Sequence, residues 1–148
     1  MPAFQSSRSV GFSPDQMFDL VADVEHYPEF LPLCEGLKIR KRLTLEDGRE
    51  VLLADMIVGY KAIRETFTSR VTLDRSTLRI DVEYVDGPFS HMENIWRFKA
   101  NGNSTTVEFS INYQFKSRML GLLMGGMFDQ AFRRFADAFE KRAAKIYR

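Results

Sequence analysis

The C-terminal segment 119–148 constrains the fold most, because it needs a large apolar partner surface. From Phe128 onward, apolar residues recur every three or four positions, which places one continuous apolar stripe on an α-helix. The stripe comprises Phe128, Ala131, Phe132, Phe135, Ala138, Phe139, Ala143 and Ile146. The opposite helix face is charged, and the chain before this segment consists mainly of strand-like patterns. We therefore expect a sheet to wrap around a long amphipathic helix.

The segment 119–127, just before this stripe, has a different character. It is apolar nearly all round and contains Gly121, Gly125 and Gly126. Each glycine inside a helix costs roughly 1 kcal/mol relative to alanine, so this end should be the less rigid one. Two interpretations are open. The segment is either a mobile lid or membrane-touching edge that includes Leu122 and Leu123, or ordinary core packing with glycines at close approaches.

Length and composition bound the class of protein. A chain of 148 residues has ordinary single-domain size, and we expect one domain spanning 1–148. The formal net charge of +1 excludes an overall electrostatic drive toward nucleic acid, although a local basic patch is compatible with it. The single cysteine excludes an intramolecular disulfide. We find no membrane-spanning apolar run and no secretion signal, so we predict a cytoplasmic protein, with a peripheral position at the inner membrane as an alternative.

The first third of the chain predicts a strand and two short helices. Residues 3–10 suit a first strand. Ser13 provides a helix N-cap, Pro14 suits the first helical position and Gln16 completes a capping box. The segment 27–32 has room for one further helical turn, which its second proline should end.

From residue 37 the apolar period changes to two, which is typical of strands. The first of these strands is predicted to have an apolar face and a basic face, formed respectively by Leu37, Ile39, Leu43 and Leu45 and by Lys38, Arg40 and Arg42. An Asp-Gly hairpin turn follows at 47–48, and then a nearly all-apolar strand at about 49–58. Gly59 is predicted to mark a bend or bulge. Several alternating strands with short connections complete an antiparallel sheet.

Several motifs occur along the chain in the order expected of one family. They are YPEFLPLC at 27–34, GYKAIRETFTSRVT at 59–72, GPF at 87–89, WRF at 96–98, FKS at 115–117, AFEKR at 138–142 and Tyr147. With these motifs, the chain resembles the coenzyme Q-binding START-domain family of the polyketide cyclase-like, helix-grip superfamily. Members of that family include mitochondrial ubiquinone-binding proteins and the bacterial ribosome association toxin. Leu33 and Pro88 depart from the family's usual residues, which affects details of the pocket and leaves the fold unchanged.

The element order and the resemblance agree on one fold. A strand, two helices, six strands and a long helix form an α+β, helix-grip (START-like) architecture. We expect a curved antiparallel sheet of about seven strands wrapped around the C-terminal helix. Any space left between helix and sheet would be an elongated apolar cavity.

The resemblance implies that this cavity binds a polyprenyl quinone such as ubiquinone. The protein would then be a carrier or chaperone that supports respiration or quinone biosynthesis, and it would catalyse no reaction. The ligand-binding residues implied are Phe30, Leu31, Phe67, Val82, Tyr84, Phe89, Met92, Trp96, Phe109, Tyr113, Phe128, Phe132 and Phe135. For the aromatic residues among them, an ordinary role in the core is the alternative.

The sequence contains few groups that could act in catalysis. His26 and His91 lie near predicted turns, far apart in sequence, and with Cys34 they do not match the spacing of a metal site. We therefore expect neither a catalytic site nor a bound metal.

Inward-facing polar groups would support a third function, that of a polyketide cyclase-like enzyme. Asp55, Glu65 and Asn94 share strand parity with apolar residues. A carboxylate inside an apolar cavity would have a raised pKa and could act in acid–base chemistry. A strand-end position near solvent is the simpler explanation, so we expect Glu65→Gln to leave lipid retention intact.

The basic strand face, Lys38, Arg40 and Arg42, has two functional interpretations besides a solvated surface. Anionic headgroups could attract it and hold the edge with Leu122 and Leu123 against a membrane. Alternatively, it could contact RNA phosphates of the large ribosomal subunit, as a ribosome-binding toxin that blocks subunit association would. Since the strand carries no interleaved stacking aromatics, we favour the membrane or a solvated face. The sequence leaves the oligomeric state and the delivery partner undetermined.

Overall fold

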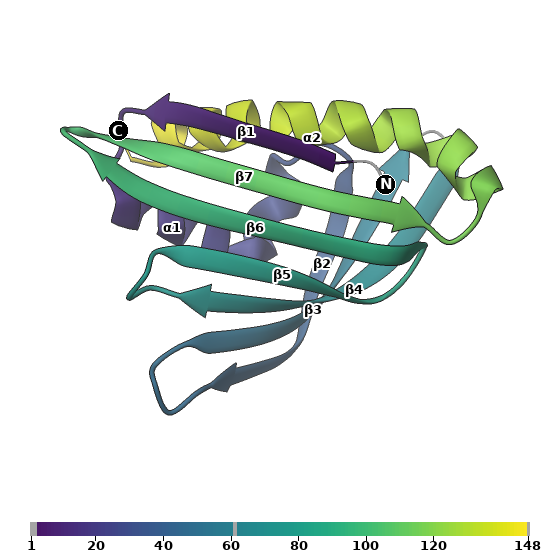
Figure 1. Cartoon of the computed structure of the whole chain (residues 1–148), viewed down its shortest axis with the longest axis horizontal. Helices are drawn as coiled ribbons and strands as arrows, with labels where there is room; N and C mark the ends of the chain where they lie inside the picture. The colour runs from purple at the N-terminus through teal and green to yellow at the C-terminus, as the bar shows by residue number, and fades with distance from the viewer. Residues whose placement is uncertain (1–2, 61, 148) are drawn as a thin grey trace.

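The structure, a computed structural model, describes residues 3–60 and 62–147 and shows a curved antiparallel sheet with a long helix on its concave side (Figure 1). The strands are β1 (Ala3–Val10), β2 (Cys34–Thr44), β3 (Glu50–Tyr60), β4 (Ile63–Asp74), β5 (Arg79–Asp86), β6 (Phe89–Asn101) and β7 (Ser104–Phe115). The helices are α1 (Pro14–Ala22), the 3-10 helix η1 (Val24–Glu29) and α2 (Arg118–Ile146). The predicted fold class and element order are confirmed.

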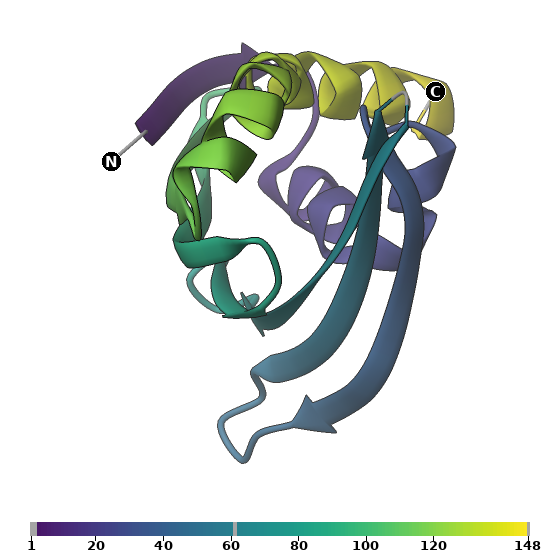
Figure 2. The same cartoon turned by 90° about the vertical axis from the view of Figure 1, so that its right-hand side faces the viewer.

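The seven strands form one sheet in the order β1-β7-β6-β5-β4-β3-β2, and every pairing is antiparallel. After β1 the chain crosses to the far edge of the sheet through α1 and η1. The strands from β2 to β7 then return as a meander until β7 pairs with β1. Seen from the end of the molecule, the sheet curls, and α1 and η1 lie within the curve together with α2 (Figure 2). The three helices and the concave sheet face therefore enclose one core.

The start of α1 follows the predicted capping box. The Ser13 hydroxyl accepts a hydrogen bond from the backbone N–H of Gln16 at 3.1 Å, and the Gln16 side chain accepts one from the Ser13 N–H at 3.0 Å. The predicted second helical turn is displaced, because η1 begins at Val24 and ends before the predicted stop. Val24 and Tyr27 are both buried, and their spacing of three residues puts them on the same face of a 3-10 helix.

Helix α2 is one continuous helix that includes the glycine-containing segment. The hydroxyl of Ser117 caps it by accepting a hydrogen bond from the Leu120 N–H at 3.1 Å. The predicted apolar stripe packs against the sheet, with one exception: Ile146 is 46% exposed. Tyr147 packs at this end instead, where its ring lies 6.1 Å from that of Phe12 and its hydroxyl donates to the backbone oxygen of Gln16 at 2.9 Å.

Strand β2 departs from the predicted alternation. The register shifts between Ile39 and Lys41, so Arg40 is the extra residue of a β-bulge. Ile39 pairs with Ala54 on the concave side, whereas Leu43 pairs with Val51 on the convex side and is 50% exposed. A single inserted residue reverses the side of every residue after it. The prediction of one uninterrupted apolar face is therefore wrong, and Leu45 lies beyond the strand.

The predicted bend or bulge at Gly59 is also wrong. Gly59 pairs in register with Arg64 inside the β3–β4 ladder. A β-carbon at this position would lie 2.2 Å from a carboxylate oxygen of Glu35. The glycine makes room for the Glu35 side chain of the neighbouring strand and does not mark a change of direction.

The packing of α2 on the sheet generates a stability prediction. Phe139 is 2% exposed, and its ring lies 5.4, 5.2 and 5.1 Å from those of Tyr27, Phe30 and Trp96. We expect Phe139→Ala to lower the free energy of unfolding by about 3–5 kcal/mol, because it leaves a cavity among these rings. Urea unfolding measures the change. The control on the same helix, Ile146→Ala, should change it by less than about 0.5 kcal/mol; equal losses in the two variants would contradict this packing.

Candidate ligand-binding site

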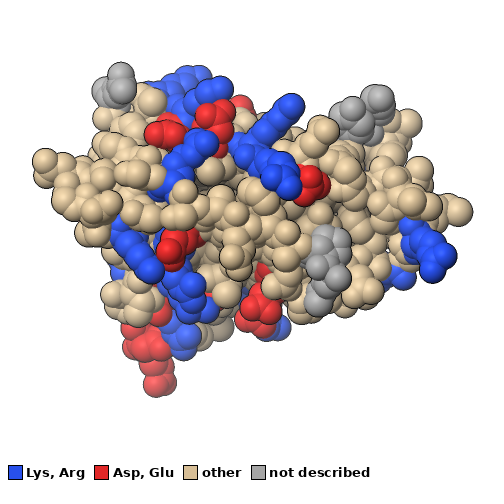
Figure 3. All heavy atoms as spheres, turned by 45° about the horizontal axis from the view of Figure 1, so that its top comes forward, with Lys and Arg blue, Asp and Glu red and all other residues tan. Residues whose placement is uncertain are grey.

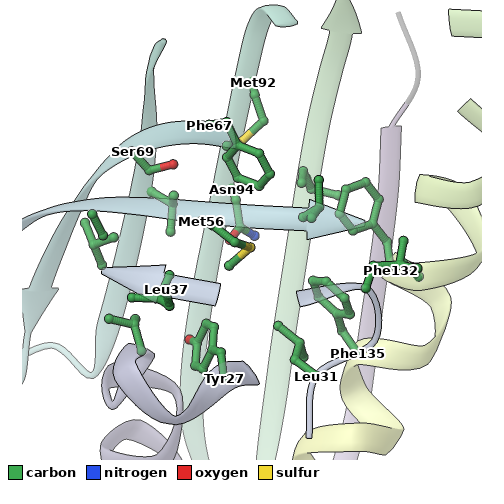
Figure 4. Close-up of a pocket in the computed structure, with 18 of the residues that line it drawn as sticks. Tyr27, Leu31, Leu37, Met56, Phe67, Ser69, Met92, Asn94, Phe132 and Phe135 are labelled. Carbon is green, nitrogen blue, oxygen red and sulfur yellow. The ribbon is translucent and has the colours of Figure 1, made fainter. Parts of the chain in front are cut away.

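An apolar cavity lies between the concave face of the sheet and α2, beside η1 and the loop that follows it (Figure 4). The volume of the cavity, taken as the space open to the centre of a water molecule, is about 100 Å³. By the same measure one water molecule needs roughly 10–15 Å³, so the space exceeds that of a single buried water. The cavity is therefore large enough to admit part of a small apolar ligand.

The walls of the cavity follow from strand and helix periodicity. Alternate residues of β3, β4 and β6 supply Ala54, Met56, Val58, Phe67, Ser69, Val71, Met92, Asn94 and Trp96. Helix α2 supplies Phe128, Ala131, Phe132, Phe135 and Phe139. Helix η1 and the next loop supply Val24, Tyr27, Leu31, Pro32 and Leu33. Elements from both ends of the chain thus meet around one space.

The structure brings most of the predicted ligand residues together at this cavity. Nine of the thirteen line it: Leu31, Phe67, Val82, Phe89, Met92, Trp96, Phe128, Phe132 and Phe135. Ligand binding by these residues stays a prediction.

The other four, Phe30, Tyr84, Phe109 and Tyr113, lie outside the lining. Phe109 and Tyr113 are buried on β7 and pack against α2, with the Tyr113 ring 5.3 Å from that of Phe132. The Tyr84 hydroxyl accepts a hydrogen bond from the Phe89 N–H at 3.0 Å, and Phe30 lies under the Arg142 guanidinium. These four residues lie behind the lining and pack against it.

Two polar lining residues, Ser69 and Asn94, are absent from the predicted ligand set. The alternation along β6 predicts that Asn94 lies on the same strand face as Met92 and Trp96, and it does face the cavity. Ser69 lies two residues from Phe67 on β4 and therefore on the same strand face. This alternation would have allowed Ser69 to be predicted as a lining residue.

The two carboxylates considered for acid–base chemistry lie elsewhere. Asp55 shares its parity with residues on the convex face, where its carboxylate lies 2.9 Å from Nε of Arg40 and accepts a hydrogen bond from the Thr68 hydroxyl at 2.5 Å. Glu65 is half-buried and pairs with Val58, outside the lining. Among the described residues that line the cavity, none carries a carboxylate. The hypothesis that Asp55 acts as a base inside the cavity is therefore wrong.

The histidines and the cysteine lie on separate elements. His26 is exposed on η1; the hydrogen bond that its Nδ1–H donates to the Asp23 carboxylate, 2.6 Å away, and the charge of that carboxylate raise the pKa of the imidazole. His91 is exposed on β6, 2.9 Å from the side-chain oxygen of Asn112. Burial raises the pKa of the Cys34 thiol to about 11, so the reactive thiolate is scarce at neutral pH. In residues 3–60 and 62–147, no three His, Cys, Asp or Glu side chains are grouped to hold a metal ion.

The basic strand face is largely neutralised by neighbouring acids. Arg40 pairs with Asp55, and the β-bulge turns Arg42 to the concave side, 3.8 Å from Glu25 and 3.6 Å from Glu50. In the face shown by Figure 3, cationic and anionic side chains are also interspersed. The residues predicted to share one basic face therefore do not form a continuous basic patch.

The N-terminal end of α2 exposes apolar side chains instead. Leu122 is 82% exposed, Leu123 57% and Met119 69%, whereas Met124 on the same helix is buried. Within the part of the chain that the structure describes, no helix combines the length and apolarity needed to span a membrane.

Comparisons with known proteins agree with this architecture. The family described as polyketide cyclase / dehydrase and lipid transport matches residues 10–140. The ribosome association toxin RatA of Rickettsia prowazekii is 30% identical over 99% of each chain. The coenzyme Q-binding protein COQ10 homolog B of Xenopus laevis is 32% identical over 97% of this chain and 59% of its own length.

Solved structures share the fold. The 18 kDa protein CC1736 from Caulobacter crescentus is 33% identical over 99% of both chains, with a TM-score of 0.81. The Zhui aromatase/cyclase from Streptomyces sp. R1128 is 18% identical over 99% of this chain and 96% of its own, with a TM-score of 0.80, so that likeness concerns the fold alone. With a family match over most of its length and relatives that align from end to end, the chain belongs to the START-like polyketide cyclase / dehydrase and lipid transport family.

Proposed function

We propose that this protein binds a polyprenyl quinone, such as ubiquinone, in the cavity and carries it to respiratory or biosynthetic enzymes without chemical turnover. The observation that carries the proposal is the composition of the cavity wall: aromatic and aliphatic side chains, a few uncharged polar groups and, among the described lining residues, no carboxylate. The relative named as a coenzyme Q-binding protein supports the same ligand class.

The cavity suits a flat head with an isoprenoid tail. Aromatic walls such as Phe67 and Phe89 can contact a planar ring, and the methionines Met56 and Met92 can adjust to an irregular chain. At roughly 25 cal/mol per Å² of buried apolar area, two or three isoprene units supply several kcal/mol before association costs. Since the open space is about 100 Å³, most of a long tail would lie outside the cavity or displace wall side chains.

The proposal of a carrier rather than an enzyme rests on the same wall. Acid–base turnover of a polyketide would need a positioned proton donor or acceptor at the substrate. Asp55 and Glu65 lie outside the lining, and the likeness to the solved aromatase/cyclase concerns the fold alone. A cyclase-like activity therefore ranks third.

The second candidate is a ribosome-binding regulator of subunit association. Relatives named ribosome association toxin align with almost the whole chain. In addition, a groove between α2 and the η1 end contains Arg134, Lys141, Arg142 and Lys145 together with Glu29 and Asp137. Cations outnumber anions there, as contact with RNA phosphates would require. Co-sedimentation with purified large subunits that weakens steeply with added salt would favour this candidate.

The quinone proposal predicts a bound lipid. Protein purified from a quinone-producing host and extracted with organic solvent should release a stoichiometric polyprenyl quinone by mass spectrometry, compared with a control protein of similar size. Ala54→Leu should reduce the recovered quinone by about tenfold or more, because Ala54 is 5% exposed and its larger replacement fills the cavity.

The matched control is Ile57→Phe, which enlarges an exposed residue of the same strand. This variant should retain quinone, and so should Glu65→Gln. An empty wild-type extract, with no uptake of added quinone, would refute the carrier function and favour the ribosome.

A peripheral membrane position predicts that the exposed leucines of α2 contact lipid. The double variant Leu122→Ser, Leu123→Ser should reduce co-flotation with vesicles containing anionic lipid by about fivefold or more, because it removes apolar area that enters the interface. Leu43→Ser, which changes an exposed leucine on β2, should not reduce it. Equal flotation of the double variant and the wild type would exclude this edge as the contact.

A further inference from the structure

The cavity contains few polar atoms, and most of them have partners within the protein. Four lining residues carry nitrogen or oxygen in the side chain: Tyr27, Ser69, Asn94 and Trp96. The hydroxyl of Tyr27 donates to the backbone oxygen of Val21, and the indole N–H of Trp96 donates to the side-chain oxygen of Asn94 at 3.2 Å. These two groups are therefore occupied, and the other two decide what polar ligand the cavity can recognise.

Asn94 is held so that one donor stays available. Its side-chain nitrogen donates to the backbone oxygen of Ser110 at 2.8 Å, while its oxygen accepts from Trp96. The two contacts fix which end of the amide is nitrogen. The second N–H has no acceptor among the described residues. Asn94 is 8% exposed and lies in the middle of the lining (Figure 4).

Ser69 is the polar residue of the lining whose side chain makes no hydrogen bond within the described protein. It is 7% exposed, and in residues 3–60 and 62–147 its hydroxyl has no hydrogen-bond partner. The buried threonines differ: the hydroxyl of Thr68 donates to Asp55 at 2.5 Å, and that of Thr105 donates to the backbone oxygen of Phe12 at 2.6 Å. Its oxygen is not among the fully enclosed side-chain atoms without a partner, so it is open to the cavity, where a ligand or a water molecule can supply the partner.

The register places the two donors on strands separated by one strand. Ser69 on β4 pairs with Tyr84 of β5, and Asn94 on β6 pairs with Val82 of β5. Strand spacing therefore puts their backbones roughly 10 Å apart across the sheet. The carbonyl oxygens of a 1,4-quinone point to opposite sides of one small flat ring, which suits donors approaching from two sides.

We propose that Ser69 and Asn94 form the head-group site of the cavity and donate hydrogen bonds to the oxygens of the quinone ring. The inference rests on the proposed quinone function and adds the orientation of the ligand. The ring would lie over β5, between the two donors. The tail would follow the aromatic series Phe67, Phe89 and Phe128, whose neighbouring rings are 5.9 and 5.6 Å apart, toward the N-terminal half of α2.

The test uses Ser69→Ala, which removes a hydroxyl without breaking any bond within the described protein. Its probes are a dimethoxy-methyl-benzoquinone with two isoprene units and a hydrocarbon of the same tail without the ring. The only tryptophan, Trp96, lines the cavity, so its quenching by the quinone reports binding and the hydrocarbon is measured by competition. We expect Kd for the quinone to rise about 3- to 10-fold, as for one lost hydrogen bond, with the hydrocarbon unchanged.

Thr66→Ala serves as the control, because it removes an exposed hydroxyl from the same strand. Thermal unfolding without ligand should give Ser69→Ala a Tm equal to or above that of the wild type. Unchanged quinone affinity in Ser69→Ala, or an equal loss for quinone and hydrocarbon, would overturn the head-group site while leaving a quinone carrier in place. A wild-type protein that binds the hydrocarbon and not the quinone would refute both.

Discussion

Burial of the aromatic face of α2 in the concave sheet is the interaction on which the rest of the structure depends. Phe89 lies at its centre, with rings of β4, β5, β7 and α2 within 6 Å of its own. Small residues interrupt this aromatic packing: Ala54 and Ser69 face each other in the β3–β4 register, and Ala131 lies on the helix wall. Protein interiors normally fill such gaps, so small side chains among large rings are what keep a cavity open.

Periodicity and capping signals allowed α1, α2, the element order and the fold class to be predicted, because each signal is local, whereas the second helical turn was misplaced by three residues. The three-and-four spacing of α2 and the capping box at Ser13 depend only on neighbouring residues. The bulge at Arg40 is different, since the extra residue is defined by the partner strand, and nothing in the sequence of β2 marks it. After that point the predicted faces were inverted.

The same limit applies to the candidate site. Strand parity correctly grouped Asp55 with its neighbours and Asn94 with Met92 and Trp96. Parity does not say which group faces inward, because that depends on the curvature of the whole sheet. Asp55 consequently lies with Arg40 on the convex face, whereas Asn94 lies in the cavity.

The two proposed functions would use different faces of α2, one lining the cavity and one bearing cations.

The charged, bulged strand β2 also has a meaning for the protein's behaviour in a crowded solution. It forms one edge of the open sheet, where unpaired backbone groups could template a strand from another molecule. Arginine and lysine side chains together with a bulge make such a strand a poor template. The opposite edge, β1, is tied to α2 through Arg8, 3.1 Å from Glu140 and 3.6 Å from Asp137. Strand β2 is thus a poor site for edge-to-edge association, and β1 is held against α2, so the sheet can stay open around its cavity without closing into a barrel.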